Sequence, residues 1–503
     1  MSYSSLKSGT DIRGFAADGF EKEPLFLSDE KVEKIALGFI KFLCKKTGKN
    51  PDEISVCVGH DSRVSARRIK SALLRAFSGK GVSVFDCSLA STPAMFMAVL
   101  DLKCDGSVQI TASHHPWERN GLKFFTPDGG LESGDISEIL TDAENESNCG
   151  LALNEGKITS VDYMSTYAEN LRKMIKSGVN SKNYDKPLDG YKIIVDAGNG
   201  VGGFYAEKVL APLGADITGS QFLEPDGMFP NHIPNPENAE AMKSVTKATV
   251  DSKADLGVIF DTDVDRAGCV DKNGEEINRN NLVALASVLA LEGTQGGVIV
   301  TDSVTSDGIP EFIKSLGGEH YRYKRGYRNV INKQIELNNQ GKFCPLAIET
   351  SGHAAFKENY YLDDGAYLMT KIIIYMAKNG ADSIKTVLSN LNQPKEAKEL
   401  RFNITCEDFK AYGNEVLDKL VDYFGNKQGW KIADDNRDGI RISADKENGD
   451  GWILLRLSVH DPVMPFNAES NSDGGVQTML KEFYSFAKEQ KNLDIAPLEK
   501  FLK

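Results

Sequence analysis

A serine that directly follows an expected strand has the surroundings of a nucleophile. The apolar run Val108–Ile110 predicts a buried strand, and it leads into Thr111-Ala112-Ser113-His114-His115, where Pro116 excludes a helix. Open α/β sheets bind ligands at the carboxyl ends of their strands, so Ser113 stands where a reacting hydroxyl would. The same residues also suit an ordinary turn between a strand and a helix, and the rest of the chain has to decide between the two.

Three carboxylates follow another expected strand, Leu256–Phe260, at the alternate positions Asp261, Asp263 and Asp265. Carboxylates this close repel one another unless a cation lies between them, and their hard oxygens suit Mg²⁺. An EF-hand calcium loop begins in the same way, but its sixth and twelfth positions would here be Arg266 and Lys272 instead of Gly and Glu. A solvated acidic turn is the alternative, although Arg266 beside three acids makes better sense if it also holds a phosphate.

Glycines at positions 198, 200 and 203 match the G-x-G-x-x-G pattern of dinucleotide-binding turns. They follow the expected strand Tyr191–Val195, and Asp216 stands near the distance expected of a ribose-binding acid. However, Asp196 places a charge where that strand should run apolar into the turn. We therefore favour a tight turn that brings backbone close to a shared site.

Basic residues gather in two places of an otherwise acidic chain, one comprising Arg322, Lys324, Arg325 and Arg328 and the other Arg437, Arg441 and Arg456. Guanidinium groups bind phosphate through two hydrogen bonds, so an anion site assembled from separate domains is one interpretation and solvated surface charge is the other. His353 stands in a loop with Glu349 and Ser351 and is a candidate proton shuttle, with a purely structural histidine as the alternative.

The segments that carry these residues alternate between strand and helix patterns, which predicts parallel or mixed α/β sheets. The expected strands that end in polar loops are Ile54–Val58, Tyr191–Val195, Leu256–Phe260, Gly297–Val300 and Leu346–Ile348. Ser65–Phe77 is predicted as an amphipathic helix, and Thr92-Pro93 as the start of another. This order is typical of three related α/β domains.

The chain changes character after Ser389. Residues 392–399, which are polar and contain Pro394, are predicted to be a linker. Beyond them, Ile440–Ser443 and Trp452–Ser458 are expected strands and Gly474–Lys488 an expected closing helix. The C-terminal part therefore looks like a small α+β domain.

Composition limits the class of protein further. The 503 residues are 41% hydrophobic and 26% charged, as in globular proteins of several domains. A net charge of −13 argues against nucleic acid or an anionic membrane as the main partner. Eight cysteines without a C-x-x-C pair predict reduced thiols. No secretory signal or membrane-spanning run is found, so a soluble, cytoplasmic protein is expected.

Together the motifs resemble the α-D-phosphohexomutase family, which includes phosphoglucomutase and phosphomannomutase. Thr111–Pro116 looks like the family's phosphoserine loop, Asp261–Arg266 like its metal loop, and Glu349–His353 like its sugar-recognition loop. Ser8–Gly14 and Asp226–His232 are also similar to motifs of the family. The motifs follow the family's order over nearly the whole chain.

The resemblance implies three similar mixed-sheet α/β domains and a C-terminal α+β domain in a heart-shaped arrangement. The domains would cover residues 1–157 with the phosphoserine loop, 158–271 with the metal loop, 272–390 with the sugar-recognition loop and 391–503 with a phosphate-binding loop. The chemistry it implies is interconversion of hexose 1-phosphate and hexose 6-phosphate, of glucose and/or mannose. The route would be phosphoserine at Ser113 and a bound 1,6-bisphosphate, with glucose 1,6-bisphosphate as activator.

The resemblance also implies roles for single residues. One Mg²⁺ per chain would be held by phosphorylated Ser113 together with Asp261, Asp263 and Asp265. Arg13, His114, Lys123 and Arg266 would surround the phosphoserine, with His353 and Lys123 as acid–base candidates. The residues implied to contact the phosphosugar are Arg13, Arg266, Lys324, Glu349, Ser351, His353, Arg456 and Ser458.

The chain departs from the family's usual motifs in three loops. Tyr327 stands where some relatives have histidine, and His115 replaces the usual asparagine. In the C-terminal phosphate loop, Val459 removes a side-chain donor and His460 puts an imidazole in place of a hydroxyl. We expect Arg456 and Ser458 to retain an altered phosphate site.

Two other functions stay open at this point. In a metal-dependent sugar phosphatase, water would hydrolyse the phosphoserine at Ser113. A non-catalytic paralogue of the family would keep only the fold. The expected partner is a phosphosugar, without nucleic acid or membrane. The preferred hexose, the general acid or base, and the choice between monomer and dimer are not determined by the sequence.

Overall fold

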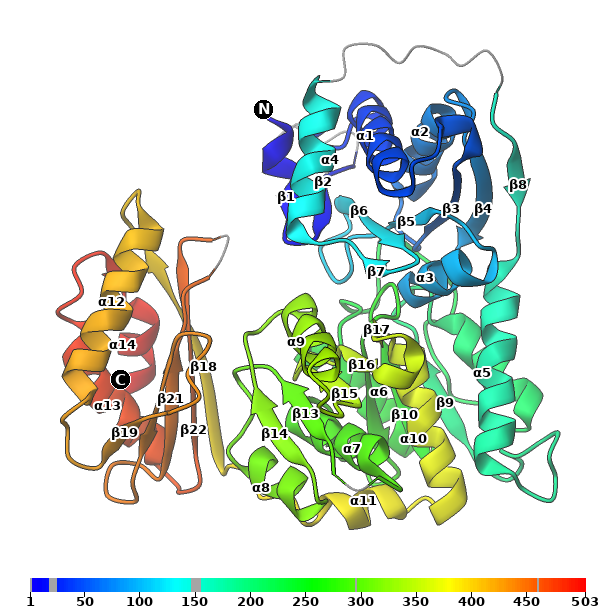
Figure 1. Cartoon of the computed structure of the whole chain (residues 1–503). Helices are drawn as coiled ribbons and strands as arrows, with labels where there is room; N and C mark the ends of the chain where they lie inside the picture. Colours follow the sequence, from blue (N-terminus) through cyan, green and yellow to red (C-terminus); the bar gives the residue numbers. More distant parts are fainter. Residues whose placement is uncertain (1, 18–24, 146–154, 295, 459–460) are drawn as a thin grey trace. The chain divides into compact units, whose positions relative to one another are not determined.

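The computed structural model describes residues 2–17, 25–145, 155–294, 296–458 and 461–503. Figure 1 shows their helices and strands in sequence colours, and they divide into two compact units. The first unit comprises Met1–Glu292 with Pro345–Leu388, and the second comprises Gly293–Cys344 with Ser389–Lys503. The serine, aspartate and sugar-loop motifs all belong to the first unit, whereas the basic clusters belong to the second.

The N-terminal sheet of the first unit has the strand order β1-β2-β6-β5-β3-β4-β8, with β7 paired to β6. Its strands are β1 (Lys7–Ser8), β2 (Asp11–Phe15), β3 (Ser55–His60), β4 (Ser83–Leu89), β5 (Gly106–Ile110), β6 (Arg119–Thr126), β7 (Gly129–Gly130) and β8 (Ile158–Ser160). β5, β3, β4 and β8 run parallel, while β2 and β5 are antiparallel to β6. This is a mixed sheet, as predicted.

Helices cover both faces of this sheet because successive side chains of a strand point to opposite sides. Phe124 of β6 packs in one core with α1 (Asp29–Thr47), α2 (Ala66–Ser78) and α4 (Ser133–Asn145). Phe125 packs on the other face against Phe96 and Val99 of α3 (Thr92–Asp101). As predicted, α3 begins at Thr92, where Ser91 caps the helix by accepting from the amide of Ala94 and Pro93 lies in the first turn.

The second sheet has the order β12-β11-β10-β9. Its strands are β9 (Ile193–Asp196), β10 (Leu256–Phe260), β11 (Ala267–Asp271) and β12 (Glu276–Ile277). β9 and β10 are parallel, so the glycine turn after β9 and the aspartate loop after β10 leave the same edge of the sheet. The associated helices are α5 (Tyr163–Val179), α6 (Ala239–Ser252), α7 (Arg279–Leu291) and the π-helical turn η3 (Tyr205–Leu210).

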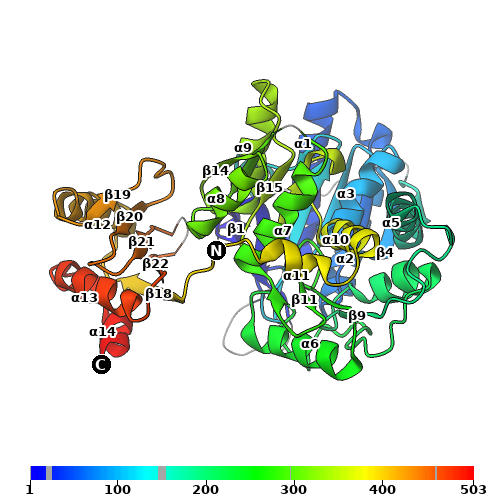
Figure 2. The same cartoon turned by 90° about the horizontal axis from the view of Figure 1, so that it is seen from below.

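The strands of the third α/β domain are shared between the two units. In the first unit, β15 (Leu346–Ile348), β16 (Ala354–Phe356) and β17 (Leu362–Asp363) are antiparallel. α10 (Gly365–Asn379) and α11 (Ser383–Leu388) follow them and lie beside α7 (Figure 2). In the second unit, β13 (Val298–Thr301) and β14 (Glu319–Arg322) are parallel and are accompanied by α8 (Gly308–Ser315) and α9 (Tyr327–Asn339).

The C-terminal sheet has the order β19-β20-β21-β22-β18-β23, with antiparallel neighbours. Its strands are β18 (Glu396–Ile404), β19 (Trp430–Ile432), β20 (Ile440–Ala444), β21 (Gly451–Leu455), β22 (Val463–Ser470) and β23 (Leu493–Asp494). α12 (Phe409–Phe424), α13 (Gly475–Ala487) and α14 (Ala496–Leu502) supply apolar side chains to its core. The predicted α+β character is confirmed.

Some sequence boundaries need correction. The predicted linker 392–399 is wrong in its second half, because β18 begins at Glu396 and buries alternate side chains in its later part despite its polar sequence. The expected strand Trp452–Ser458 ends at Leu455, so Arg456 and Ser458 lie beyond it. β8 pairs with β4 in the first sheet, although the sequence placed residues from 158 onward in the next domain.

A buried tyrosine anchors the start of α10 and gives a stability prediction. The Tyr167 hydroxyl lies 2.7 Å from both carboxylate oxygens of Asp364, which also caps α10 by accepting from the amide of Tyr367 at 2.9 Å. Replacing Tyr167 by Phe removes a buried donor to a carboxylate, which costs about 1–3 kcal/mol. We expect Tyr167→Phe to lower the thermal unfolding midpoint by several degrees, measured by circular dichroism. Tyr184→Phe, at an exposed tyrosine, is the control, and equal midpoints for the two variants would contradict the prediction.

Candidate active site

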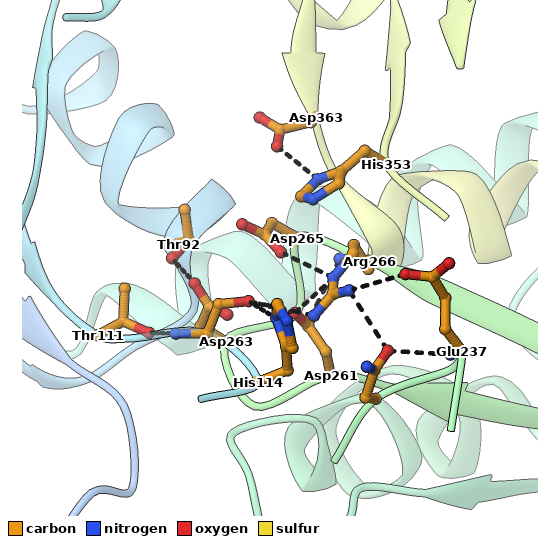
Figure 3. A network of polar contacts seen from close by, with 12 residues as sticks. Thr92, Thr111, His114, Glu237, Asp261, Asp263, Asp265, Arg266, His353 and Asp363 are labelled. Carbon is orange, nitrogen blue, oxygen red and sulfur yellow. Dashed lines mark hydrogen bonds and ion pairs between the residues drawn. The ribbon is translucent and has the colours of Figure 1, made fainter. Parts of the chain in front are cut away.

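Three aspartates project from the loop between β10 and β11. The side chains of Asp261, Asp263 and Asp265 are fully buried, and one oxygen of each lies within 4.8 Å of the others. Val264 has a φ of 68°, which turns the loop back on itself between the second and third carboxylates. Figure 3 shows Asp261 and Asp265 beside Arg266, and Asp263 on the side of Thr92.

Neighbouring segments hold this loop by its backbone. A Cβ on Gly200 would lie 2.6 Å from the carbonyl oxygen of Thr262, and the amide of Val201 donates to that oxygen at 2.9 Å. From α3, the Thr92 amide donates to the Asp263 carbonyl at 2.9 Å, and its hydroxyl donates to the Asp263 carboxylate. The glycine turn therefore supports the aspartate loop through close backbone approach, as the tight-turn interpretation predicts.

Burial and mutual repulsion separate the protonation behaviour of the three acids. Desolvation and the charge of Asp265 raise the pKa of Asp261 well above its ordinary value and raise that of Asp263. Burial also opposes ionisation of Asp265, but the Lys123 ammonium, followed by His353 and Arg266, lowers the pKa of Asp265. Lys123 of β6 forms an ion pair with Asp265 and lies 3.9 Å from Asp263.

The donor set fits Mg²⁺. Among the described residues, Asp263 Oδ1 and Asp265 Oδ1 are buried and accept no hydrogen bond. Buried carboxylate oxygens without donors are costly, and a hard divalent cation with oxygen ligands removes that cost. Asp261, Asp263 and Asp265 are thus the residues of this loop that would hold the ion.

Ser113 lies against this loop. Its hydroxyl donates to Asp261 Oδ2 at 3.0 Å and accepts from Arg266 Nη2 at 3.2 Å. His114 Nδ1 is 3.2 Å from the same hydroxyl oxygen. The backbone of Ser113 is left-handed, with a φ of 51°, and its amide donates to the hydroxyl of Thr111 at 2.9 Å. The nucleophile candidate and the aspartate loop therefore form one site.

The two imidazoles after Ser113 are neutral at physiological pH. Desolvation, followed by the charge of Arg266, lowers the pKa of His114 to about 2. Desolvation, followed by the charge of Arg13, lowers the pKa of His115 to about 3. A neutral imidazole can donate or accept one hydrogen bond at each nitrogen, so positive charge around Ser113 comes from Arg266, Lys123 and Arg13 rather than from these two histidines.

The two predicted arginines hold different places. Arg266 is buried, donates to Asp261 through Nε at 3.0 Å and to Asn235 through Nη1 at 3.3 Å. Arg13 lies on β2 opposite Gly121 of β6 and pairs with Asp11 at 2.8 Å. Arg266 therefore contacts Ser113 directly, whereas Arg13 acts through its charge on the loop Thr111–Pro116, called the serine loop below.

The predicted sugar-recognition loop packs on the aspartate loop. His353 forms an isolated antiparallel bridge with Arg266, and a Cβ on Gly352, whose φ is 98°, would lie 2.7 Å from the Ala267 carbonyl oxygen. His353 Nδ1 is 3.0 Å from Asp363 Oδ2. Burial favours the neutral ring, but Asp265 and Asp363 together raise the pKa of His353. This histidine is accordingly suited to hold a proton near neutral pH.

The same loop offers groups for a hydroxylated ligand. Glu349 and Ser351 are buried beside His353. Within the described part of the chain, Ser351 Oγ is buried and has no hydrogen-bond partner. A buried hydroxyl without a hydrogen-bond partner is expected to form a hydrogen bond with a ligand, and a sugar hydroxyl could be its partner.

The second unit carries the remaining predicted residues. Arg456 Nη1 lies 3.5 Å from Asp438 Oδ2, an oxygen that also accepts from the Ser303 hydroxyl at 2.6 Å and from the Arg325 amide at 3.1 Å. Lys324 is exposed, and Ser458 Oγ accepts from the amide of Asp461 at 3.3 Å. The altered residues Val459 and His460 lie outside the described residues.

One arginine of each basic cluster is structural. Arg441 pairs with Asp307 at 2.7 Å and stacks on Trp452, with its guanidinium carbon 3.5 Å from the ring centroid. Arg322 pairs with Asp435 at 2.8 Å. The positive charges of these two arginines are thus balanced by ion pairs within the second unit.

Sequence reasoning missed several contributors to the site. Thr92 was noted only as a helix start, and Asp363 and Asp438 were not singled out. No local pattern marks them, because each becomes relevant only through a side-chain contact that the fold creates, with Asp263, His353 and Arg456 respectively.

Comparison with protein-family models supports the assignment of the fold and site. Residues 7–148, 165–274 and 278–394 match phosphoglucomutase/phosphomannomutase α/β/α domains I, II and III. These matches cover most of the chain. The protein therefore belongs to the phosphoglucomutase/phosphomannomutase family, the α-D-phosphohexomutases.

Individual relatives agree with this membership. A phosphoglucomutase/phosphomannomutase of Thermococcus kodakarensis is 31% identical over 473 residues, which are 93% of this chain and 96% of the relative. A phosphoglucomutase of Neisseria meningitidis is 29% identical over 440 residues, covering 87% and 89% of the two chains. A crystal structure of a family protein from Burkholderia thailandensis is similar, with a TM-score of 0.77, 25% identity and 98% coverage of both chains.

These findings make the protein a phosphohexomutase, an isomerase of carbohydrate metabolism, and they do not favour the phosphatase or the non-catalytic paralogue. A search of the described residues found no helix with the length and hydropathy required to cross a membrane.

Loss of one carboxylate should weaken metal binding. Replacing Asp263 by Asn removes a negative ligand while keeping nearly the same volume and the contact with Thr92. We expect the affinity for Mn²⁺, followed by electron paramagnetic resonance, to fall by at least about 10-fold. Asp382→Asn, at a residue paired with Lys272, is the control. Equal Mn²⁺ affinity in the two variants would place the metal elsewhere.

Proposed function

We propose that this phosphohexomutase interconverts hexose 1-phosphates and hexose 6-phosphates, of glucose and/or mannose, with Ser113 as the phosphoryl carrier. The observation that carries the proposal is the position of the Ser113 hydroxyl between Asp261, at 3.0 Å, and Arg266, at 3.2 Å. Phosphoryl transfer depends mainly on positioning and on neutralisation of charge, and this hydroxyl has both kinds of partner. The names of the curated relatives support glucose and mannose phosphates as substrates.

The proposed cycle has two transfers. Phosphoserine 113 gives its phosphoryl group to the free hydroxyl of the sugar phosphate, which yields a bound 1,6-bisphosphate and the serine hydroxyl. After the intermediate has turned around, the other phosphoryl group returns to Ser113. The enzyme is thus an intramolecular phosphotransferase in its net reaction, and free glucose 1,6-bisphosphate would act as activator by phosphorylating Ser113.

Side chains of the first unit would carry the transfer. Arg266 neutralises the phosphoryl oxygens beside Ser113, and Lys123 contributes a second positive charge at Asp265. Bound Mg²⁺, one per chain, would supply further positive charge at the transferred group. His353, held by Asp363, and Lys123 are the candidates for moving the proton of the attacking sugar hydroxyl.

Further residues of the motifs would recognise the sugar phosphate. Glu349 and Ser351 are placed on the loop that carries His353 and would bind ring hydroxyls. Arg456, Ser458 and Lys324 would hold the phosphate that is not being transferred, with Arg13 adding charge at the serine end. We further propose a cytoplasmic enzyme, with a phosphosugar as its partner rather than nucleic acid or a membrane, and a monomer or dimer.

Ser113→Ala tests the carrier role. Without the hydroxyl no phosphoenzyme can form, so we expect kcat for glucose 1-phosphate and mannose 1-phosphate to fall by at least about 10⁴-fold in coupled assays. Ser71→Ala, at a residue on α2, is the control. Intact-mass measurement of the wild-type protein should show one phosphate that is lost on addition of sugar phosphate.

The same assay separates a mutase from a phosphatase. A mutase is stimulated by glucose 1,6-bisphosphate and releases no net inorganic phosphate. Continuous release of phosphate, or full activity of Ser113→Ala, would contradict the proposed cycle.

Arg456→Ala tests the distal phosphate site. Removal of a charged hydrogen-bonding group costs about 1.5–3 kcal/mol, so we expect KM for the hexose phosphate to rise by about 10- to 100-fold. Arg401→Ala, at an exposed arginine of β18, is the control. Unchanged KM and kcat in Arg456→Ala would mean that the distal phosphate binds elsewhere.

A further inference from the structure

The backbone of Ser113 has an unfavourable conformation that something must maintain. Its φ of 51° lies in the left-handed region, which costs a residue with a Cβ roughly 1–2 kcal/mol. The hydroxyl reaches Asp261 and Arg266 from this conformation. The groups that hold the backbone of the serine loop therefore also decide where the hydroxyl lies.

One buried guanidinium spans the whole serine loop. Arg63 Nη2 donates to the carbonyl oxygens of Ser113 at 2.5 Å and His115 at 2.6 Å, and Nη1 donates to those of Pro116 at 2.7 Å and Arg119 at 2.8 Å. The Arg63 side chain is fully buried, so water does not compete for these carbonyls. A planar group with several fixed donors is a rigid template for four carbonyl oxygens.

Asp61 balances the charge of this template. The Arg63 amide donates to Asp61 Oδ1 at 3.0 Å, and Arg63 Nε lies 3.3 Å from Asp61 Oδ2. The Asp61 amide in turn donates to the carbonyl of Ile110, the last residue of the strand that leads to Ser113. The Asp61–Arg63 pair thus holds both the end of β5, at Ile110, and the serine loop that follows it.

A loop of the second α/β domain, the motif Asp226–His232, covers Arg63 and is called the covering loop below. The proposed cycle gives this motif no role. A Cβ on Gly227 would lie 2.4 Å from the Ser62 carbonyl oxygen and 2.4 Å from the Val64 amide nitrogen, so the two backbones are in close contact. The Phe229 ring covers Arg63, with 5.3 Å between the ring centroid and the guanidinium carbon. Phe229 itself has a φ of 49°.

This covering loop is anchored on the glycine turn that supports the aspartates. The Asp226 amide donates to the Asn199 carbonyl at 2.9 Å, and Asn231 donates to the Asn199 side chain at 2.8 Å. Two residues further along the turn, Val201 contacts the aspartate loop through Thr262. The glycine turn therefore contacts both the covering loop and the aspartate loop. Through these contacts it connects the serine loop, which Arg63 holds, to the aspartates.

We propose that Arg63 is a positioning residue for phosphoryl transfer: it fixes the left-handed backbone of Ser113 against the aspartate loop, and the Asp226–Phe229 segment locks Arg63 in place. The proposal rests on the proposed function in that Ser113 is the phosphoryl carrier. Arg63 donates to backbone carbonyls of the serine loop and not to the carboxylates of Asp261, Asp263 or Asp265. Its loss should therefore affect the transfer step more than substrate or metal binding.

Arg63→Lys is the direct test, because lysine keeps the charge but cannot span four carbonyl oxygens. Misplacement of a reacting group by about 1 Å costs about 10²-fold in rate, so we expect kcat to fall by about 10²-fold while KM stays within about threefold. Phosphorylation of Ser113 by glucose 1,6-bisphosphate, followed by intact mass, should slow by the same factor. Mn²⁺ affinity should not change.

The control is Arg68→Lys. Arg68 also donates to two backbone carbonyls, those of Ala16 and Leu27, and pairs with Asp29, and these three residues lie outside the serine loop. We expect this variant to keep both kcat and KM. A similar loss of kcat in both variants would mean that the loss follows from general destabilisation and not from a misplaced serine loop, which would overturn the proposal.

A second variant covers the case in which Arg63→Lys does not fold. Gly227→Ala pushes the covering loop away through its backbone and leaves Arg63 in place, so we expect kcat to fall by about 10-fold at constant KM. Gly134→Ala is its control, because a Cβ there meets no atom within 4 Å. Wild-type kcat in folded Gly227→Ala would remove the locking role of the loop.

A crystal structure of the variant protein gives a readout that does not depend on activity. In Arg63→Lys, or in Gly227→Ala if the former does not fold, Ser113 should leave the left-handed region and its hydroxyl should move beyond about 3.5 Å from Asp261. An unmoved Ser113 would overturn the proposal. Failure of the proposed function would instead appear as full activity of Ser113→Ala, whatever the position of the serine.

Discussion

Three fully buried carboxylates at the end of β10 are the constraint on which the rest of the site depends. Burying one unpaired charge costs several kcal/mol, and three within one loop can be tolerated only if positive groups and donors surround them. Lys123 comes from β6, Arg266 from the loop itself, His353 from the segment before β16 and Thr92 from the start of α3. Each of these segments is thereby fixed relative to the aspartates.

The need to balance this charge explains why Ser113 lies where it does. Its hydroxyl donates to the same carboxylate that pairs with Arg266, so one aspartate orients both the reacting group and its cationic neighbour. The uncharged histidines beside the serine add hydrogen-bonding capacity without adding charge. Because these two histidines stay neutral, the positive charge beside the Ser113 hydroxyl comes from Arg266 and Lys123, which suits the binding of a dianionic phosphate.

Local sequence patterns were sufficient where a function depends on one segment. The aspartate triplet, the serine after β5 and the histidine loop after β15 are continuous motifs, and strand ends place them at a sheet edge. Patterns were insufficient where a partner comes from another segment of the fold, as for Arg63, which donates to the Ser113 carbonyl, and Asp438, which lies beside Arg456. For Arg441 and Arg322 they left phosphate binding and solvated charge both open, and the structure pairs these arginines with Asp307 and Asp435.

The discontinuous first unit has a consequence for synthesis of the protein. Its last segment, Pro345–Leu388, follows an excursion of the chain into the second unit. During translation, the segments with Ser113 and Asp261–Arg266 therefore emerge well before the loop with His353. At about 5–20 residues per second, synthesis of the chain from Arg266 to His353 takes roughly 4–17 s. In that interval the carboxylates lack one of their cationic neighbours, which makes Lys123 and Arg266 the groups that must stabilise the growing chain.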